Sequence, residues 1–402
     1  MPDKYGDQPS VIVVGGGPAG LTAAITLADA GLATVLVGKR PTRPDNRTTA
    51  LFAGSITALE TLGVWPLCAA QAAPLKIMRI VDDTGRLWRA PEVKFAADEI
   101  GLDAFGYNIE NRHLIAALNE RAAQLNIPRV DAPAVTVTSE PASVTIEHQN
   151  GTARARLVVG AEGQRSLCRA AVGIGTDRRN YPQTALTLNL GHERPHRDTA
   201  TEFHTESGPL TLVPLPGRRS SLVCVLDPPR AAALFAMTGV ELSAEIERCA
   251  HSLFGQMSVE PGCGLFPLAV MTADSFARGR VALVGEAAHV VPPIGAQGLN
   301  LGLRDAATLA EIVADARREN GDVGSAGVLA RYDAQRRADV TSRRIAIDLL
   351  NRSLLTDFFL MQGVRGLSLF LIDRIGPLRR ALMREGVTPA ASQPRLMRGE
   401  MV

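Results

Sequence analysis

The chain has 402 residues, of which 46% are hydrophobic, and its charge is almost balanced, with 43 Lys and Arg against 41 Asp and Glu. This length allows two lobes with a sizeable core, and the scattered basic residues argue against a nucleic-acid partner. Its five cysteines lack CxxC or metal-type spacing, and we find neither a bilayer-length apolar run nor a signal segment before the first strand, so we expect a reduced, cytoplasmic protein without a metal site.

The first predicted unit is a strand, a glycine-rich turn and a helix. The aliphatic run 11–14 leads into GGGPAG at 15–20, and a helical pattern and a second strand at 33–37 follow. In the spacing G-x-G-x-x-G, the glycines allow a tight turn and let a pyrophosphate approach the N-terminus of the helix. The pattern therefore predicts a dinucleotide site.

The acidic residue that usually ends the second strand of such a unit is absent. That residue holds the ribose of the dinucleotide. Its position is occupied here by Gly38, which Lys39 and Arg40 follow. Lys39 is a candidate phosphate contact, with a solvated loop as the alternative, and we do not interpret the basic pair as a preference for NADP.

Two arginines are candidate cofactor contacts in the next segments. Arg47 follows the second strand closely enough to reach back over a bound dinucleotide. Residues 75–95 predict an antiparallel excursion around a DDTG turn, after which the chain returns through a helix with Arg112 near its start. A cation at a helix N-terminus opposes the helix dipole, so Arg112 is a candidate contact for a phosphate or a flavin.

Two later segments repeat the sequence of strand, glycine, carboxylate and helix start. The first is VVGAEGQRSLCR at 158–169, and the second is ALVGEAAHVVPPIGAQGLNLGLRD at 282–305. In the second segment, a helix that starts near Gly298 directs unpaired N–H groups and a positive dipole end at a ligand. Three such corners around one ligand indicate a long dinucleotide, which favours FAD over NAD.

The three segments together resemble the FAD motifs of the single-component (class A) flavoprotein aromatic hydroxylases. The likeness extends over about residues 10–386. Within it, QGLNLGLRD at 297–305, SGPLTLVPLPG at 207–217 and LARYDAQRRAD at 329–339 are similar to the ubiquinone-biosynthesis hydroxylase branch. The family most often has Asp at positions 162 and 286 and an acid at 38, where this chain has Glu, Glu and Gly.

The strand pattern and the resemblance imply an α/β fold. We expect a Rossmann-like FAD-binding lobe with a parallel sheet, interleaved with an antiparallel-sheet substrate lobe and followed by C-terminal helices. The expected ranges are 10–74, 101–175 and 273–345 for the FAD-binding lobe, 75–100 and 176–272 for the substrate lobe, 346–386 for the C-terminal helices and 387–402 for a polar tail.

The resemblance also implies roles for the motif residues. The glycines of the first motif would contact the FAD pyrophosphate, Glu162 would lie where FAD meets a transient NADPH or NADH, and Glu286 would bind the ribityl or pyrophosphate region. The backbone of 298–300 would face the flavin pyrimidine ring. The expected cofactor-binding residues are Gly15, Gly17, Pro18, Ala19, Gly20, Lys39, Arg47, Arg112, Glu162, Gly163, Gly285, Glu286, Pro293, Gln297, Gly298, Leu299 and Asn300.

The implied activity is that of an FAD-dependent aromatic monooxygenase. NADPH or NADH would reduce FAD, O₂ would add to give a flavin C4a-hydroperoxide, and its distal oxygen would attack the ring of a hydrophobic, polyprenylated phenol. The helix start at 298–300 would stabilise the reduced flavin, and the Pro292-Pro293 turn with the Pro293 carbonyl would exclude water. His289 is a candidate proton-transfer residue, with a structural role as the alternative.

Two other functions stay open at this point. One is a related FAD-dependent hydroxylase or reductase with another hydrophobic substrate, and the other is a non-catalytic FAD-binding member of a quinone-biosynthesis complex. Residues 364–386 place Leu, Phe, Ile and Arg at helical spacing. They predict either peripheral contact with the inner membrane or a helix packed on the FAD-binding lobe.

Overall fold

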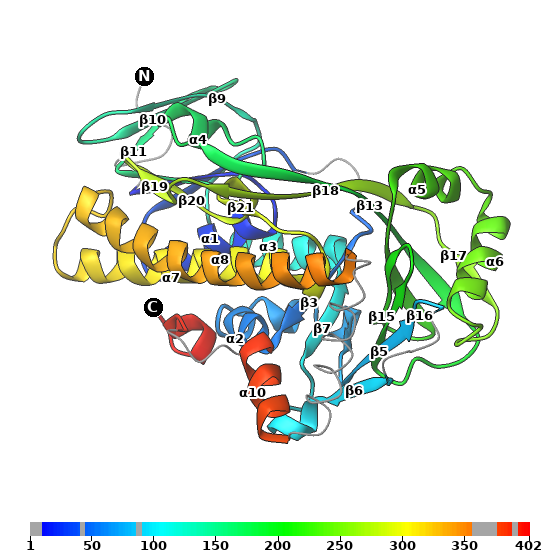
Figure 1. Cartoon of the computed structure of the whole chain (residues 1–402). Coiled ribbons are helices and arrows are strands. Elements are labelled where there is room, and N and C mark those ends of the chain that lie inside the picture. The colour runs from blue at the N-terminus through cyan, green and yellow to red at the C-terminus, as the bar shows by residue number, and fades with distance from the viewer. Residues whose placement is uncertain (1–9, 41–44, 86–90, 356–375, 388–392) are drawn as a thin grey trace.

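The computed structural model describes residues 10–40, 45–85, 91–355, 376–387 and 393–402 (Figure 1). The described residues form the predicted α/β fold, with a parallel sheet and a larger, mainly antiparallel sheet. Both predicted lobes are interleaved along the chain because each sheet takes strands from separate segments. The exact lobe boundaries stay predictions.

The parallel sheet carries the three predicted motifs at the ends of neighbouring strands. Its order is β19-β20-β12-β1-β2-β8, and β19 alone runs antiparallel to its neighbour. All four residues of β1 are buried, as the uninterrupted aliphatic run predicts for a central parallel strand. Its strands are β1 (Val11–Val14), β2 (Thr34–Val37), β8 (Arg129–Val130), β12 (Leu157–Gly160), β19 (Ala277–Arg278) and β20 (Val281–Leu283).

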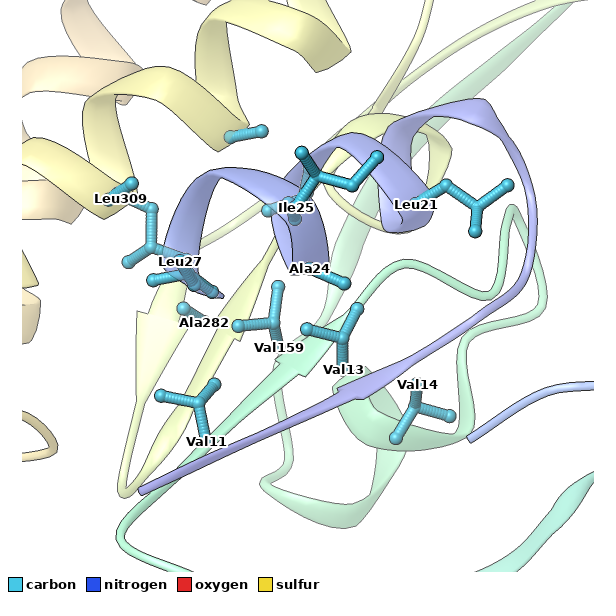
Figure 2. Packing of buried hydrophobic residues seen from close by; sticks show 14 of the residues in the cluster. Val11, Val13, Val14, Leu21, Ala24, Ile25, Leu27, Val159, Ala282 and Leu309 are labelled. Carbon is cyan, nitrogen blue, oxygen red and sulfur yellow. The ribbon is translucent and has the colours of Figure 1, made fainter. Parts of the chain in front are cut away.

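Helix α1 (Pro18–Asp29) packs on this sheet, and helix α7 (Gln297–Arg318) packs on α1. Figure 2 shows Leu27 and Ile25 of α1 above the side chains of the sheet, with Leu309 of α7 beside them. These side chains are fully buried. Burial of each such residue stabilises the fold by about 1.5–3 kcal/mol. The packing fixes the N-terminal ends of α1 and α7 at the edge where the motifs meet.

The large sheet follows the order β21-β18-β13-β16-β15-β14-β5-β6, with β17 paired to β13. The excursion at 75–95 joins this sheet because β5 pairs in parallel with β14. Its strands are β5 (Ile77–Asp83), β6 (Val93–Ala96), β13 (Thr176–His192), β14 (Thr199–Thr205), β15 (Gly208–Leu215), β16 (Arg219–Leu226), β17 (Met257–Val259), β18 (Gly264–Ala273) and β21 (His289–Val290). Strand β21 comes from the third motif, so that motif contacts both sheets.

Two small sheets and several helices complete the two lobes. Helices α5 (Pro228–Phe235) and α6 (Gly239–Cys249) contribute Leu234, Leu242 and Ile246 to the core of the large sheet. The small sheets are β3 (Thr48–Phe52), β7 (Gly106–Glu110) and β4 (Ala72–Pro74), and β9 (Ala134–Ser139), β10 (Val144–His148) and β11 (Gly151–Ala155). The remaining elements in this part are α2 (Ala53–Thr61), α3 (Asn111–Gln124), α4 (Leu167–Ala171), η1 (Trp65–Leu67), η2 (Ala69–Gln71), η3 (Ala97–Ile100), η4 (Gly285–Ala287) and η5 (Ile294–Ala296).

The C-terminal part differs from the predicted polar tail. After α8 (Ala326–Leu355) and α10 (Gly376–Val387), the chain ends in η6 (Arg395–Arg398). Leu396 and Met397 of η6 are buried, and η6 packs against α2 and α7. Residues 395–398 of the predicted polar tail therefore form a short helical turn whose two apolar side chains pack on the protein, and the predicted boundary of the tail stays a prediction.

The predicted amphipathic segment 364–386 lies partly outside the described residues. Its described end forms α10, whose Arg379 Nε donates to Glu99 Oε2 at 2.7 Å. Met383 of α10 packs with Phe105. This part of the segment therefore packs on the protein, close to η3. Within the described residues, we find no helix with the length and apolarity that crossing a bilayer requires.

Candidate functional site

The three predicted corners lie side by side at one edge of the parallel sheet. Gly160 at the end of β12 is in register with Val14 of β1 on one side and with Leu283 of β20 on the other. Ala161 N donates to Val14 O at 2.7 Å, and Val284 N donates to Gly160 O at 2.9 Å. The carboxyl ends of neighbouring parallel strands thus bring together turns that are far apart in sequence.

The first turn has the shape of a cradle for a phosphate group. A Cβ placed on Gly15 would lie 2.3 Å from Ala161 O, and one on Gly20 would lie 2.1 Å from Gly15 O, so both positions require glycine. A Cβ on Gly17, in contrast, would meet no atom within 4 Å. Gly17 is the N-cap of α1, which has no side-chain cap. The unpaired N–H groups of α1 therefore face open space beside Gly17, where a pyrophosphate fits.

The third turn presents a second helix N-terminus. Gly295 and Ala296 both have left-handed backbone conformations, with φ of 67° and 52°, directly before α7. Asn300 holds this turn because its Nδ2 donates to Ala50 O at 2.8 Å and to Ala296 O at 2.7 Å. Its Oδ1 accepts hydrogen bonds from Phe52 N and Ser55 Oγ. The Asn300 side chain is thus fully used within the protein, and only the backbone at 298–300 is available to a ligand.

Glu286 and Arg47 lie near one another at the mouth of the site. The Glu286 side chain is exposed and accepts a hydrogen bond from Gln164 Nε2 at 3.4 Å. A hydrogen bond to Asp45 raises the pKa of Arg47, and the charge of Glu286 adds to this effect. The Arg47 guanidinium also lies 5.2 Å from the centre of the Phe266 ring. An anionic side chain of the third motif and a cationic side chain beside Phe266 of the large sheet thus lie near one another.

Glu162 and Arg112 are engaged by the protein. Glu162 Oε1 accepts hydrogen bonds from Ser166 Oγ at 2.9 Å and Cys168 N at 2.7 Å, at the start of α4, while Oε2 is buried without a partner. Arg112 forms an ion pair with Glu110 at 3.0 Å. Their predicted contacts with the cofactor stay proposals, and the buried unpaired oxygen of Glu162 is the feature that supports one.

Of the remaining predicted residues, some pack against or bond to other parts of the protein and others are at least partly exposed. Ala19 packs closely on the third motif, since a Cβ on Gly285 would lie 3.0 Å from Ala19 Cβ. Gln297 Oε1 accepts a hydrogen bond from Arg343 at 3.3 Å. The residues that are exposed or partly exposed at the turns are Pro18, Lys39, Gly163, Pro293, Gly298 and Leu299.

His289 belongs to a buried ionic network. Its Nε2 donates to Asp305 Oδ2 at 2.6 Å, and Asp305 Oδ1 accepts from Arg336 Nε at 2.6 Å. Gly285 N also donates to Asp305 Oδ2. Although burial opposes ionisation, the charges of His289 and Arg336 lower the pKa of Asp305. With its side chain 1% exposed, His289 fits the structural alternative better than proton transfer.

Arg169 connects two of the motifs and was not among the predicted site residues. Arg169 donates from NH1 to Ala287 O at 2.8 Å and from NH2 to Gln164 O at 2.7 Å. Burial lowers the pKa of Arg169. It thereby joins the second corner to the third. Its place in the second motif, six residues after Gly163, was visible in the sequence, but the direction of its side chain was not.

The FAD binding domain family matches residues 8–343, which is most of the chain. This protein belongs to that family. The enzyme is 35% identical over 409 residues to the ubiquinone hydroxylase UbiL of Rhodospirillum rubrum, with 99% of this chain and 94% of that protein covered. It is 32% identical over 389 residues to 3-demethoxyubiquinol 3-hydroxylase of Escherichia coli, with 94% and 98% covered. It is accordingly an FAD-dependent monooxygenase, as the class A resemblance predicted.

Solved structures share the fold of this FAD-dependent monooxygenase. The p-nitrophenol 4-monooxygenase PnpA of Pseudomonas putida is 21% identical, with a TM-score of 0.78 and coverage of 96% of this chain and 99% of that chain. The HpxO protein of Klebsiella pneumoniae complexed with FAD and uric acid is 18% identical, with a TM-score of 0.75 and coverage of 97% and 100%. At these identities the likeness shows the fold alone.

The residues of this monooxygenase fit FAD. The open cradle beside Gly17 suits the pyrophosphate, and the helix start at 298–300 suits the electron-rich end of the flavin. FAD supplies the electron transfer and the activation of O₂ when bound. We expect the chain's own residues to hold the cofactor, to stabilise negative charge with the N-terminus of α7, and to exclude water with the Pro292-Pro293 turn.

The role of Glu286 leads to a direct test. We expect Glu286→Ala to reduce the fraction of purified protein that carries FAD by about tenfold, because a charge-assisted hydrogen bond to the ribityl chain is lost. The flavin absorbance per protein absorbance measures this fraction. Glu193→Ala, at a glutamate of the substrate lobe, serves as the control. Unchanged flavin content in Glu286→Ala would remove Glu286 from the site.

Proposed function

We propose that this monooxygenase hydroxylates the aromatic ring of a polyprenylated ubiquinone precursor, with O₂ as co-substrate and NADPH or NADH as electron donor. The observation that carries the proposal is the similarity to ubiquinone hydroxylases along nearly the whole chain, in a protein whose three FAD motifs meet at one site. The likeness includes the substrate lobe as well as the FAD-binding lobe, since it covers 99% of the chain.

An exposed aromatic side chain of the large sheet supports the proposal of a hydrophobic, aromatic substrate. Phe266 of β18 is 37% exposed and lies beside Arg47 at the mouth of the FAD site. An exposed aromatic ring next to the cofactor site offers a surface on which a phenol ring can stack. The aliphatic side chains of the large sheet form a core with α5 and α6.

The experiment that tests this function combines a cell and a purified protein. A cell that lacks the protein is expected to accumulate a quinone precursor that is short of one ring hydroxyl group. The purified, yellow protein is expected to convert that precursor with substrate-stimulated oxidation of NADPH or NADH. Normal quinone levels in the cell would contradict the ubiquinone role, and colourless protein that takes up no FAD would favour a non-catalytic function.

Peripheral contact with the inner membrane is part of the same proposal, because a polyprenyl chain partitions into a bilayer. Three apolar side chains near the junction of α5 and α6 support it. Their exposed fractions are 48% for Phe235, 37% for Met237 and 82% for Val240. We expect Phe235→Ser/Val240→Ser to lower the fraction that sediments with phospholipid vesicles. An equal bound fraction for the variant and the unchanged protein would show that this corner is not the contact.

A further inference from the structure

The end of β2 has no room for the acid that usually binds the ribose of a dinucleotide. A Cβ placed on Gly38 would lie 2.8 Å from Gly16 N and 3.2 Å from Gly15 C. Gly38 is buried against the glycine turn. A side chain at this position would displace the turn that cradles the pyrophosphate. The missing acid is therefore a consequence of close packing, and a carboxylate must come from another element if one is present.

Strand β8 lies beside this position. It pairs with β2 in parallel, with Leu36 opposite Arg129 and Val37 opposite Val130. Gly38 N donates to Val130 O at 3.0 Å, which continues the pairing to the strand end. Asp131 directly follows the last residue of β8, so a carboxylate stands at the end of the neighbouring strand, level with Gly38. The distance in sequence between the two positions hides this from any local pattern.

The Asp131 carboxylate is turned toward β2. Its Oδ1 accepts a hydrogen bond from Arg40 N at 2.8 Å, two residues after Gly38. Its other oxygen has no hydrogen-bond partner among the residues that the structure describes, and the side chain is exposed. One oxygen thus anchors the carboxylate over the end of β2, and the other is available to a ligand there.

We propose that Asp131 supplies, from β8, the carboxylate that binds the adenosine ribose of FAD. The acid would then stand at the end of β8 instead of the end of β2, at the same edge of the sheet. Its new position keeps it next to the first turn, where the pyrophosphate cradle begins. The proposal depends on FAD as the cofactor and does not depend on which ring is hydroxylated.

Arg129 lies close to this carboxylate and connects the end of β2 to α3. It donates from Nε and NH2 to Gly38 O at 3.2 and 3.1 Å, and from NH1 to Asn119 Oδ1 at 2.6 Å. Burial and the charge of Arg40 lower the pKa of Arg129, while the charge of Asp131 raises it. Asp131 therefore also offsets two cations at this edge, so a test must separate ribose binding from charge balance.

The test uses apo-protein and two forms of the cofactor. FAD and an FAD analogue with 2′-deoxyribose on the adenosine side are titrated into the protein, and the quenching of flavin fluorescence reports each Kd. The unchanged protein is expected to bind FAD about tenfold more tightly than the analogue, because a hydrogen bond to a charged group is worth about this much. Asp131→Ala is expected to bind FAD about tenfold more weakly and to lose the preference between the two.

Two variants act as controls. Asp131→Asn keeps an oxygen that can accept from Arg40 N but lacks the charge, and we expect it to lose part of the preference. Asp103→Ala removes an exposed carboxylate elsewhere in the chain and is expected to bind FAD like the unchanged protein. Thermal unfolding of the apo-proteins checks that each variant is folded.

The outcomes are distinguishable. If Asp131 only balances charge, Asp131→Ala will weaken binding of FAD and of the analogue equally, and the proposal is overturned. FAD binding at full strength in Asp131→Ala overturns it as well. No turnover is measured, so the wrong choice of substrate under the proposed function leaves this result unaffected.

Discussion

Replacing Gly17 with valine is expected to abolish FAD binding while the protein stays folded. Gly17 has φ of −80° and ψ of 175°, an extended conformation that valine adopts without strain. A Cβ at this position meets no protein atom within 4 Å, so the new side chain projects into the cradle. There it prevents the close approach of the pyrophosphate to the backbone. We expect the Kd for FAD to rise by at least about 100-fold.

Flavin content measures the loss of FAD binding, and the unfolding temperature of the apo-protein shows whether the variant stays folded. Gly20→Val is the matched comparison in the same turn. A Cβ on Gly20 would lie 2.1 Å from Gly15 O, so this variant should lose stability as well as FAD. If Gly17→Val retains its yellow colour, the pyrophosphate does not lie in the cradle and the first motif has been misinterpreted.

Asp305→Ala is expected to cause the largest loss of stability. Asp305 is fully buried between His289 and Arg336, whose side chains are 1% and 3% exposed. Removal of the carboxylate leaves the buried Arg336 guanidinium with Asp339, whose Oδ2 lies 2.6 Å from NH1. We therefore expect a loss toward the lower end of the about 3–5 kcal/mol that breaking a buried ion pair typically costs. Gly285 N loses its acceptor too. We therefore expect a lower free energy of unfolding in urea and a lower flavin content, because Gly285 belongs to the third motif.

Glu140→Ala is the control for this effect. Glu140 pairs with Arg154 at 3.1 Å, and both side chains are about half exposed, at 51% and 50%. An ion pair of this kind contributes about 1 kcal/mol or less. Equal unfolding free energies for the two variants would show that the buried network does not stabilise the protein.

Most of the fold near the site was predictable from local patterns. The aliphatic run of β1 and the glycines that follow it have short-range causes, because burial on both faces selects aliphatic residues and a tight turn selects glycine. The same holds for α3, whose apolar positions recur at helical spacing. For η6, the sequence pattern carries no signal, because Leu396 and Met397 are too few to produce a periodic pattern.

The candidate site was predictable only in part. The motif glycines and Glu286 could be named as candidates because their types and spacing suit a dinucleotide, and their contacts with FAD stay predictions. The partner of His289 could not be predicted, because Asp305 lies in α7 and its second partner, Arg336, lies in α8. The role of Arg169 depends on a contact with the third motif that no spacing reveals. These interactions arise where separate segments meet, and their geometry follows from packing.

The sequence by itself determined the family, the FAD motifs and the order of strands and helices, because each depends on neighbours within a few residues. Only the tertiary structure decided which side chains at the site are free to act. It placed His289 in a buried network and set Asp131 beside Gly38, 93 positions away in the sequence. The pairing of β8 with β2 is the physical reason, since the order of strands in a parallel sheet is fixed by packing over the whole lobe.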